Sequence, residues 1–157
     1  VRTALDAALP PGLDVVDCVE ARTPEFATRL EASIWRIELP EVDSGVLAAA
    51  WESLLAADEV QVERMTKNGL RTFDARGAVL AGECVSGDSG TCAILTVVVR
   101  HGTPSVRPDD ILSALRQVAD LVPPKPPRVT RLAQAPLDEA GIQVTDPLAP
   151  DRAREEA

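Results

Sequence analysis

Four basic side chains and one aromatic ring lie close together between residues 62 and 76, and they suggest the binding of phosphate. Arginine and lysine side chains contact the backbone of a nucleic acid, and an aromatic ring offers a surface on which an unpaired base can stack. The stretch therefore predicts a binding surface rather than a catalytic centre. Its candidate residues are Arg64, Lys67, Arg71, Phe73 and Arg76.

The dipeptide Asn68-Gly69 predicts that this stretch is a β-hairpin. Asn-Gly is the strongest short-range signal for a two-residue hairpin turn, because both central residues need a positive φ. With the turn at these two residues, Arg64 faces Phe73 across the strands. Side chains alternate between the faces of a strand, so Arg71 lies on the same side as both.

The same charges also fit a hairpin that binds nothing. Charged residues on a solvated strand keep its edge from pairing with other chains. In that case Arg64 packs over Phe73 as a cation–π contact, worth about 0.5–1 kcal/mol at an exposed site. Asp74 and Arg76 share one face of the strand, which favours a structural ion pair between them. The sequence leaves both alternatives open.

Composition limits how a nucleic acid could be bound. The chain has 157 residues and a formal net charge of −9, so its overall field repels phosphate. Binding of RNA therefore requires a local basic patch. No stretch approaches the ~20 apolar residues of a membrane span, and no signal-peptide pattern is present. We expect a protein of the cytoplasm that is not bound to a membrane.

Histidine and cysteine offer little further chemistry. His101 could act as a general base near neutral pH, but the sequence gives it no partner, and a loop histidine is the simpler interpretation. Cys18, Cys84 and Cys92 are odd in number and lack the spacing of a zinc site. A turn near Asp88 would place Cys84 opposite Cys92. We predict no catalytic residue, no metal and no cofactor.

The order of predicted elements indicates an α+β fold. From residue 32 the order is strand, helix, hairpin, hairpin, helix, strand. It predicts a ferredoxin-like (split βαβ) antiparallel sheet with two helices on one face and an extra strand pair. Trp35 and Trp51 both occupy apolar faces, so both are expected in the core. The predicted elements are a strand at 34–39, a helix from Asp43 or Ser44 to 57, hairpins at 60–76 and 78–100, a helix from 108 and a strand at 128–135.

Three regions are expected along the chain. Residues 1–30 look like the remnant of an upstream half-domain, with a helix over 1–9 and a strand over 13–21. Residues 31–136 form the ferredoxin-like domain. Residues 137–157 are rich in proline and acids, so they predict a loosely ordered tail.

Three motifs resemble the radical-SAM-linked protein family, an uncharacterised bacterial family found alone or fused behind a B12-binding radical SAM enzyme. They lie at residues 31–39, 63–76 and 105–112. The resemblance implies that the family's N-terminal half, with its Ser-His-Leu-Asp and Asn-Pro-His-Pro-Lys motifs, is absent from this sequence. Members are commonly encoded near ribonuclease E/G and ribosomal protein genes, which implies a role near RNA. The hairpin positions that match are Arg64, Thr66, Lys67, Gly69, Asp74 and Arg76.

These observations lead to one preferred function and two alternatives. We expect a non-catalytic accessory or RNA-associated module, linked to a radical SAM enzyme and binding through the basic hairpin. The first alternative is an RNA-processing enzyme on a ferredoxin-like scaffold, which should bring His101 or a carboxylate against the face of Arg64 and Arg71. The second is a protein-interaction domain that uses an exposed sheet edge.

Overall fold

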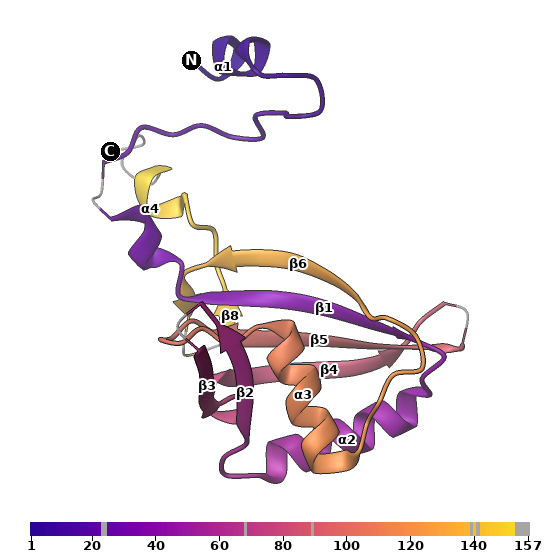
Figure 1. Ribbon diagram of the computed structural model, residues 1–157. Helices are drawn as coiled ribbons and strands as arrows, with labels where there is room; N and C mark the ends of the chain where they lie inside the picture. The colour runs from indigo at the N-terminus through magenta and orange to yellow at the C-terminus, as the bar shows by residue number, and fades with distance from the viewer. Residues whose placement is uncertain (23–24, 68, 89, 139, 141, 153–157) are drawn as a thin grey trace.

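A four-stranded antiparallel sheet with the strand order β4-β5-β1-β6 carries the fold of the computed structural model (Figure 1). The structure describes residues 1–22, 25–67, 69–88, 90–138, 140 and 142–152. The main elements are β1 (Ala32–Pro40), α2 (Ser44–Ala56), β2 (Gln61–Thr66), β3 (Gly69–Asp74), β4 (Val79–Ser86), β5 (Cys92–Arg100), α3 (Pro108–Ala119) and β6 (Arg128–Ala135).

The predicted α+β class is confirmed. If the separate β2–β3 hairpin is set aside, the order is strand, helix, two strands, helix, strand, and the sheet order is that of the split βαβ plan. The hairpin is the extra strand pair, inserted between α2 and β4.

The two long helices begin where their capping residues predict. The Asp43 carboxylate accepts hydrogen bonds from the backbone N–H groups of Gly45 and Val46, at 2.8 and 3.3 Å. The α3 helix begins at Pro108, whose missing N–H costs nothing at the first helical position. The backbone N–H of Arg107 donates to the Asp110 carboxylate at 2.7 Å, which closes the first turn of α3.

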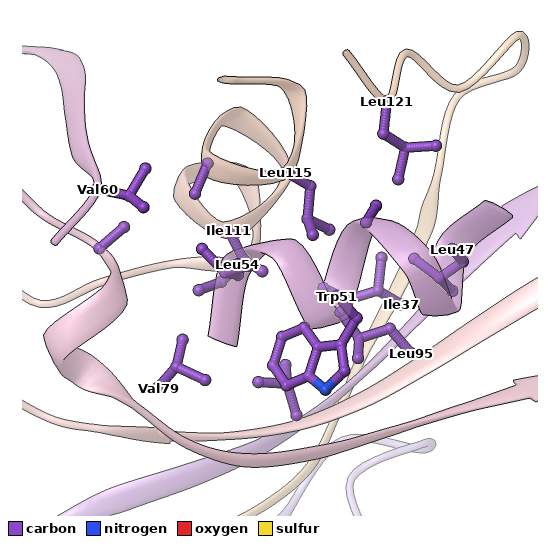
Figure 2. Close-up of a cluster of buried hydrophobic side chains, with 14 of the residues drawn as sticks. Ile37, Leu47, Trp51, Leu54, Val60, Val79, Leu95, Ile111, Leu115 and Leu121 are labelled. Carbon is purple, nitrogen blue, oxygen red and sulfur yellow. The ribbon is translucent and has the colours of Figure 1, made fainter. Parts of the chain in front are cut away.

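Both helices cover one face of the sheet and form the core with it (Figures 1 and 2). Alternation along β1 and β5 sends one set of apolar side chains, which includes Ile37, Leu95 and Val97, toward this face. Trp51 on α2 packs over β4 at Gly82, where a Cβ atom would lie 2.5 Å from the indole ring. Glycine at this position therefore allows the helix to approach the strand. Fully buried members of the core are Ile37, Leu39, Leu47, Leu54, Leu95, Val97, Ile111 and Leu115.

The hairpin register differs from the prediction by two residues. Arg64 pairs with Arg71, not with Phe73, and Thr66 pairs with Gly69. The connection is thus Lys67-Asn68, of which Asn68 lies outside the described residues. Gly69 has a φ of 102°, a conformation that glycine adopts readily. It is the first paired residue of β3, so this positive φ lies directly after the connection and not at a central position of a two-residue turn. A shift by two keeps every side chain on its predicted face.

At the two ends of the chain, one predicted element is missing. The helix α1 forms, but residues 13–22 contain no strand, so the strand predicted over 13–21 is wrong. This segment extends away from the sheet (Figure 1), and a strand needs a partner for its backbone hydrogen bonds. The described residues after 136, where composition predicts a loosely ordered tail, include short elements. These terminal elements are α1 (Arg2–Ala8), the 3-10 helix η1 (Phe26–Arg29), β7 (Leu137–Asp138), β8 (Gln143–Val144) and α4 (Ala149–Arg152).

The tail returns to η1 through one buried ion pair. The Asp151 carboxylate on α4 lies 2.8 Å from the guanidinium of Arg29, and only 2 % of the Asp151 side chain is exposed. The C-terminal part of the described chain is therefore fixed against the segment that precedes β1.

Cys84 and Cys92 are not the cross-strand partners that a turn near Asp88 would have made them. Cys84 faces Leu95, and Cys92 pairs with Pro40 on β1. The strand β4 ends at Ser86, which pairs with Ala93, and β5 begins only at Cys92. None of the described helices is long and apolar enough to cross a membrane.

Candidate functional site

The hairpin residues that carry the predicted binding surface are largely engaged in structural contacts. The Arg64 guanidinium lies 2.6 Å from the Asp110 carboxylate and donates to the Ser105 carbonyl oxygen at 3.2 Å. It also lies 4.9 Å from the centre of the Phe73 ring, which is only 8 % exposed. Arg64 and Phe73 therefore fasten the hairpin to the beginning of α3.

Arg76 is engaged as well, although not in the predicted ion pair. Its guanidinium donates to the carbonyl oxygens of Val79 and Leu55, at 3.1 and 3.3 Å. The Asp74 carboxylate accepts from three backbone N–H groups, including that of Arg76 at 2.9 Å. The contact between these two residues thus runs from a carboxylate to the backbone.

Lys67 and Arg71 are the candidate residues whose side chains are exposed. Arg64, Arg71 and Phe73 do share one face of the hairpin, as predicted. However, Arg64 and Phe73 pack toward α3, and Arg71 alone of the three is exposed to solvent. The hairpin alone therefore offers two cations and no accessible ring, which is less than its sequence suggested.

A cavity of about 530 Å³ lies nearby, on the same face of the sheet that the helices cover. Its walls come from β1, from β6 and from the loop that leads into α3, and His101 after β5 lies at one end. The lining residues that matter below are Ser33, Trp35, His101, Arg107, Arg131 and Gln134.

A β-bulge in β6 decides which side chains line this cavity. Trp35 pairs with Arg131, but Ile34 pairs with Ala133, so Leu132 is an extra residue in β6. Beyond the bulge Gln134 pairs with Ser33 and shares its face. Without the extra residue, Ala133 would take that position. The bulge thus adds an amide to the cavity wall.

Trp35 and Arg131 form a cation–π contact in the wall of the cavity. They are direct cross-strand partners, and the guanidinium lies 5.3 Å from the centre of the indole ring. Trp35 is half-buried and Arg131 is exposed. No ion pair joins Arg131 to any residue that the structure describes. The arginine is therefore free to leave the ring.

His101 has two hydrogen-bond partners that its sequence context did not reveal. Its Nδ1 lies 2.5 Å from the Leu30 carbonyl oxygen, and its Nε2 lies 2.8 Å from the Ser33 hydroxyl. A carbonyl oxygen can only accept, so Nδ1 donates and carries a proton. In the tautomer with its proton on Nδ1, Nε2 accepts from the Ser33 hydroxyl. His101 continues the β5 face beyond the end of the strand, which makes it a diagonal neighbour of Ser33.

The charge around the cavity is positive in a protein that is acidic overall. Arg107 and Arg131 supply two exposed guanidinium groups, and Asp109 supplies one exposed carboxylate. Among the described residues, no group of three or more histidine, cysteine or acidic side chains could hold a metal ion. The arrangement is suited to an anionic ligand that has an aromatic part.

Sequence reasoning missed this cavity for two reasons. The apolar alternation of β1 placed Trp35 in the core, and it does lie on the core face, but α2 and α3 leave that end of the sheet open. Arg131 could have been paired with Trp35 only if the sheet order and the register were known. The hydrophobic pattern does not reveal the bulge at Leu132.

The fold and the cavity define a ferredoxin-like α+β module with one partly open end of its sheet face. A family model described as an uncharacterized protein conserved in bacteria (DUF2344) matches residues 1–108, and the chain belongs to that family. The match contains Ser33, Trp35, His101 and Arg107 and ends at the first residue of α3. No curated protein and no solved structure matches the chain.

Proposed function

We propose that this protein is a non-catalytic, RNA-associated module that binds single-stranded RNA at the cavity beside Trp35. The observation that carries the proposal is the Trp35 ring, which is accessible in a cavity and lies beneath an exposed guanidinium. Proteins that bind single-stranded nucleic acid combine such rings with cations that follow the phosphate backbone.

The basic hairpin extends this surface from the cavity. Arg64 donates to the carbonyl oxygen of Ser105, which lines the cavity, and Arg71 is the cross-strand partner of Arg64. A strand of RNA leaving the cavity would meet Arg107 and then Arg71. In this arrangement Arg64 positions the hairpin, and the exposed cations contact phosphate.

The resemblance to radical-SAM-linked proteins supplies the partner in this proposal. The module would present RNA to a radical SAM enzyme in the cytoplasm, either as a separate chain or as part of a fusion. The three free cysteines are compatible with a reducing compartment.

Removal of the two cavity arginines tests the proposal. We expect the Arg107→Ala/Arg131→Ala variant to bind a short fluorescent single-stranded RNA about tenfold more weakly in an anisotropy titration. The slope of log K against log salt should fall by about 1.4, because each lost contact to a single strand contributes about 0.7.

A matched control removes the same charge elsewhere. Arg128 lies on β6 but pairs with Glu38 on the opposite face of the sheet, and Arg116 is exposed on α3. The Arg116→Ala/Arg128→Ala variant should bind within about twofold of the unchanged protein with the same salt slope. Equal losses in the two double variants, or no loss in either, would refute the cavity as the RNA site.

One observation favours the RNA-processing enzyme as a second candidate. Ser33, His101 and the Leu30 carbonyl oxygen form a chain of hydroxyl, base and orienting group, which is the form that an activated nucleophile takes. However, Ser33 is only 1 % exposed, so its hydroxyl is covered against a bulky substrate. This alternative would be established if the protein cleaves RNA and the His101→Gln variant does not.

A further inference from the structure

We infer that the cavity accepts a single unpaired nucleotide, whose base stacks on Trp35 in the position where the Arg131 guanidinium now lies. The inference rests on the proposed function and adds to it the unit of RNA that the site reads. Binding of RNA through phosphate contacts alone would satisfy the proposed function without it.

The size of the cavity and its aromatic content favour one nucleotide. A volume of about 530 Å³ falls within the range of about 300–1,000 Å³ that is usual for small-molecule sites. Trp35 is the aromatic residue in its lining, and a run of stacked bases would need several such rings. Phe73 and Trp51 are buried, and the exposed Phe26 does not line the cavity, so none of the three offers a second stacking surface in it.

Arg131 can exchange the ring for a phosphate. Its contact with Trp35 is an exposed cation–π contact, which is weaker than the stacking of a base on an aromatic side chain. The displaced guanidinium would remain on the rim with Arg107, where it could contact the phosphate of the same nucleotide. One movement of the Arg131 side chain would therefore uncover the face of the Trp35 ring and supply a phosphate contact.

The polar end of the cavity indicates that the base points inward. The Gln134 amide lies in the wall at this end and is only partly buried. It offers both a hydrogen-bond donor and an acceptor. An amide matches the edge of a base, whereas the guanidinium groups at the rim match a phosphate.

Tryptophan fluorescence tests the position of the base directly. Adenosine 5′-monophosphate should quench the unchanged protein saturably, and ribose 5-phosphate should not. The Trp35→Phe variant retains a stacking ring and only the buried Trp51, so its fluorescence should stay constant while it still binds RNA. Quenching of Trp35→Phe, or equal quenching by ribose 5-phosphate, would overturn the inference.

A comparison of two oligonucleotides separates this inference from the proposed function. Short oligoadenylate should bind about tenfold more tightly than an abasic backbone of the same length, because stacking on an aromatic side chain is lost in the abasic strand. The Trp35→Leu variant should remove that difference. Equal binding of both strands to the unchanged protein overturns the single-nucleotide pocket and leaves the RNA-associated function intact. Failure of both strands to bind overturns the function itself.

Discussion

Three arginines among the described residues lie over aromatic rings at similar distances, and two of these pairs, Arg64 with Phe73 and Arg131 with Trp35, differ in what else holds the guanidinium. The Arg64 guanidinium is 4.9 Å from the Phe73 ring, and the Arg131 guanidinium is 5.3 Å from the Trp35 ring. Arg64 also pairs with the buried Asp110 carboxylate, whereas no described residue forms an ion pair with Arg131. The two contacts therefore differ in their surroundings and not in their geometry, and we expect only the Arg131 contact to be exchangeable.

Truncation of the two rings should give the largest difference between the regions. Phe73 is almost fully buried, so Phe73→Ala should lower the free energy of unfolding by about 3–5 kcal/mol. Trp35 is half-buried, and Trp35→Ala should lower it by only about 1–2 kcal/mol. Urea denaturation measures both values. A larger loss for Trp35 would mean that the open end of the sheet face is part of the core.

Removal of the two guanidinium groups should separate the regions next. Arg64→Ala leaves the Asp110 carboxylate, 4 % exposed, without its cation, and should cost about 2–3 kcal/mol. Arg131→Ala should change the free energy of unfolding by no more than about 0.5 kcal/mol. The same denaturation experiment compares them. Similar losses for the two variants would contradict the distinction drawn between the pairs.

Substitution of Asp110 sharpens the interpretation of Arg64. Asp110→Asn keeps an acceptor for the Arg107 backbone N–H but removes the charge that Arg64 neutralises. In a double-mutant cycle, Arg64→Ala and Asp110→Asn should therefore show a coupling energy of about 1–3 kcal/mol. A coupling near zero would show that Arg64 acts through its contact with Phe73 alone.

The smallest expected effect concerns the covered end of the sheet face. Burial raises the pKa of the Cys84 thiol from 9.0 to about 11, and the neighbouring Glu83 carboxylate adds to the shift. The unfolded thiol ionises earlier, so this group's contribution to stability is complete below pH 9 and is lost as the pH rises through about 11. Cys84→Ala should lack that decline in unfolding experiments. Alkylation of Cys84 as fast as exposed Cys18 at neutral pH would show that this end is open too.

The sequence predicted the elements well and their relative register poorly. The β6 strand was predicted at its observed bounds, because a strand of alternating pattern between prolines has few alternatives. The partner of Arg64 is Asp110, which lies on α3 far along the chain, and no local pattern connects the two. The cavity beside Trp35 depends on the bulge at Leu132 and on diagonal contacts, and both depend on register.

The fate of the predicted hairpin site follows from the same cause. Residue types and a two-residue periodicity correctly placed Arg64, Arg71 and Phe73 on one face of the hairpin. They could not indicate that this face packs against the beginning of α3, since that requires knowledge of the tertiary contact. Conversely, Trp35 followed the apolar pattern of β1, although the helices end before they cover it.

Photocrosslinking of RNA tests the central claim most directly, since it compares the two regions in one experiment. A single-stranded RNA containing 4-thiouridine is irradiated in complex with the full chain, and the modified tryptic peptide is identified by mass spectrometry. We predict that the crosslinked nucleotide lies on residues 30–36, which contain Trp35, and that excess adenosine 5′-monophosphate reduces it. A crosslink confined to residues 72–76, which contain Phe73, would place the RNA on the hairpin and contradict this account.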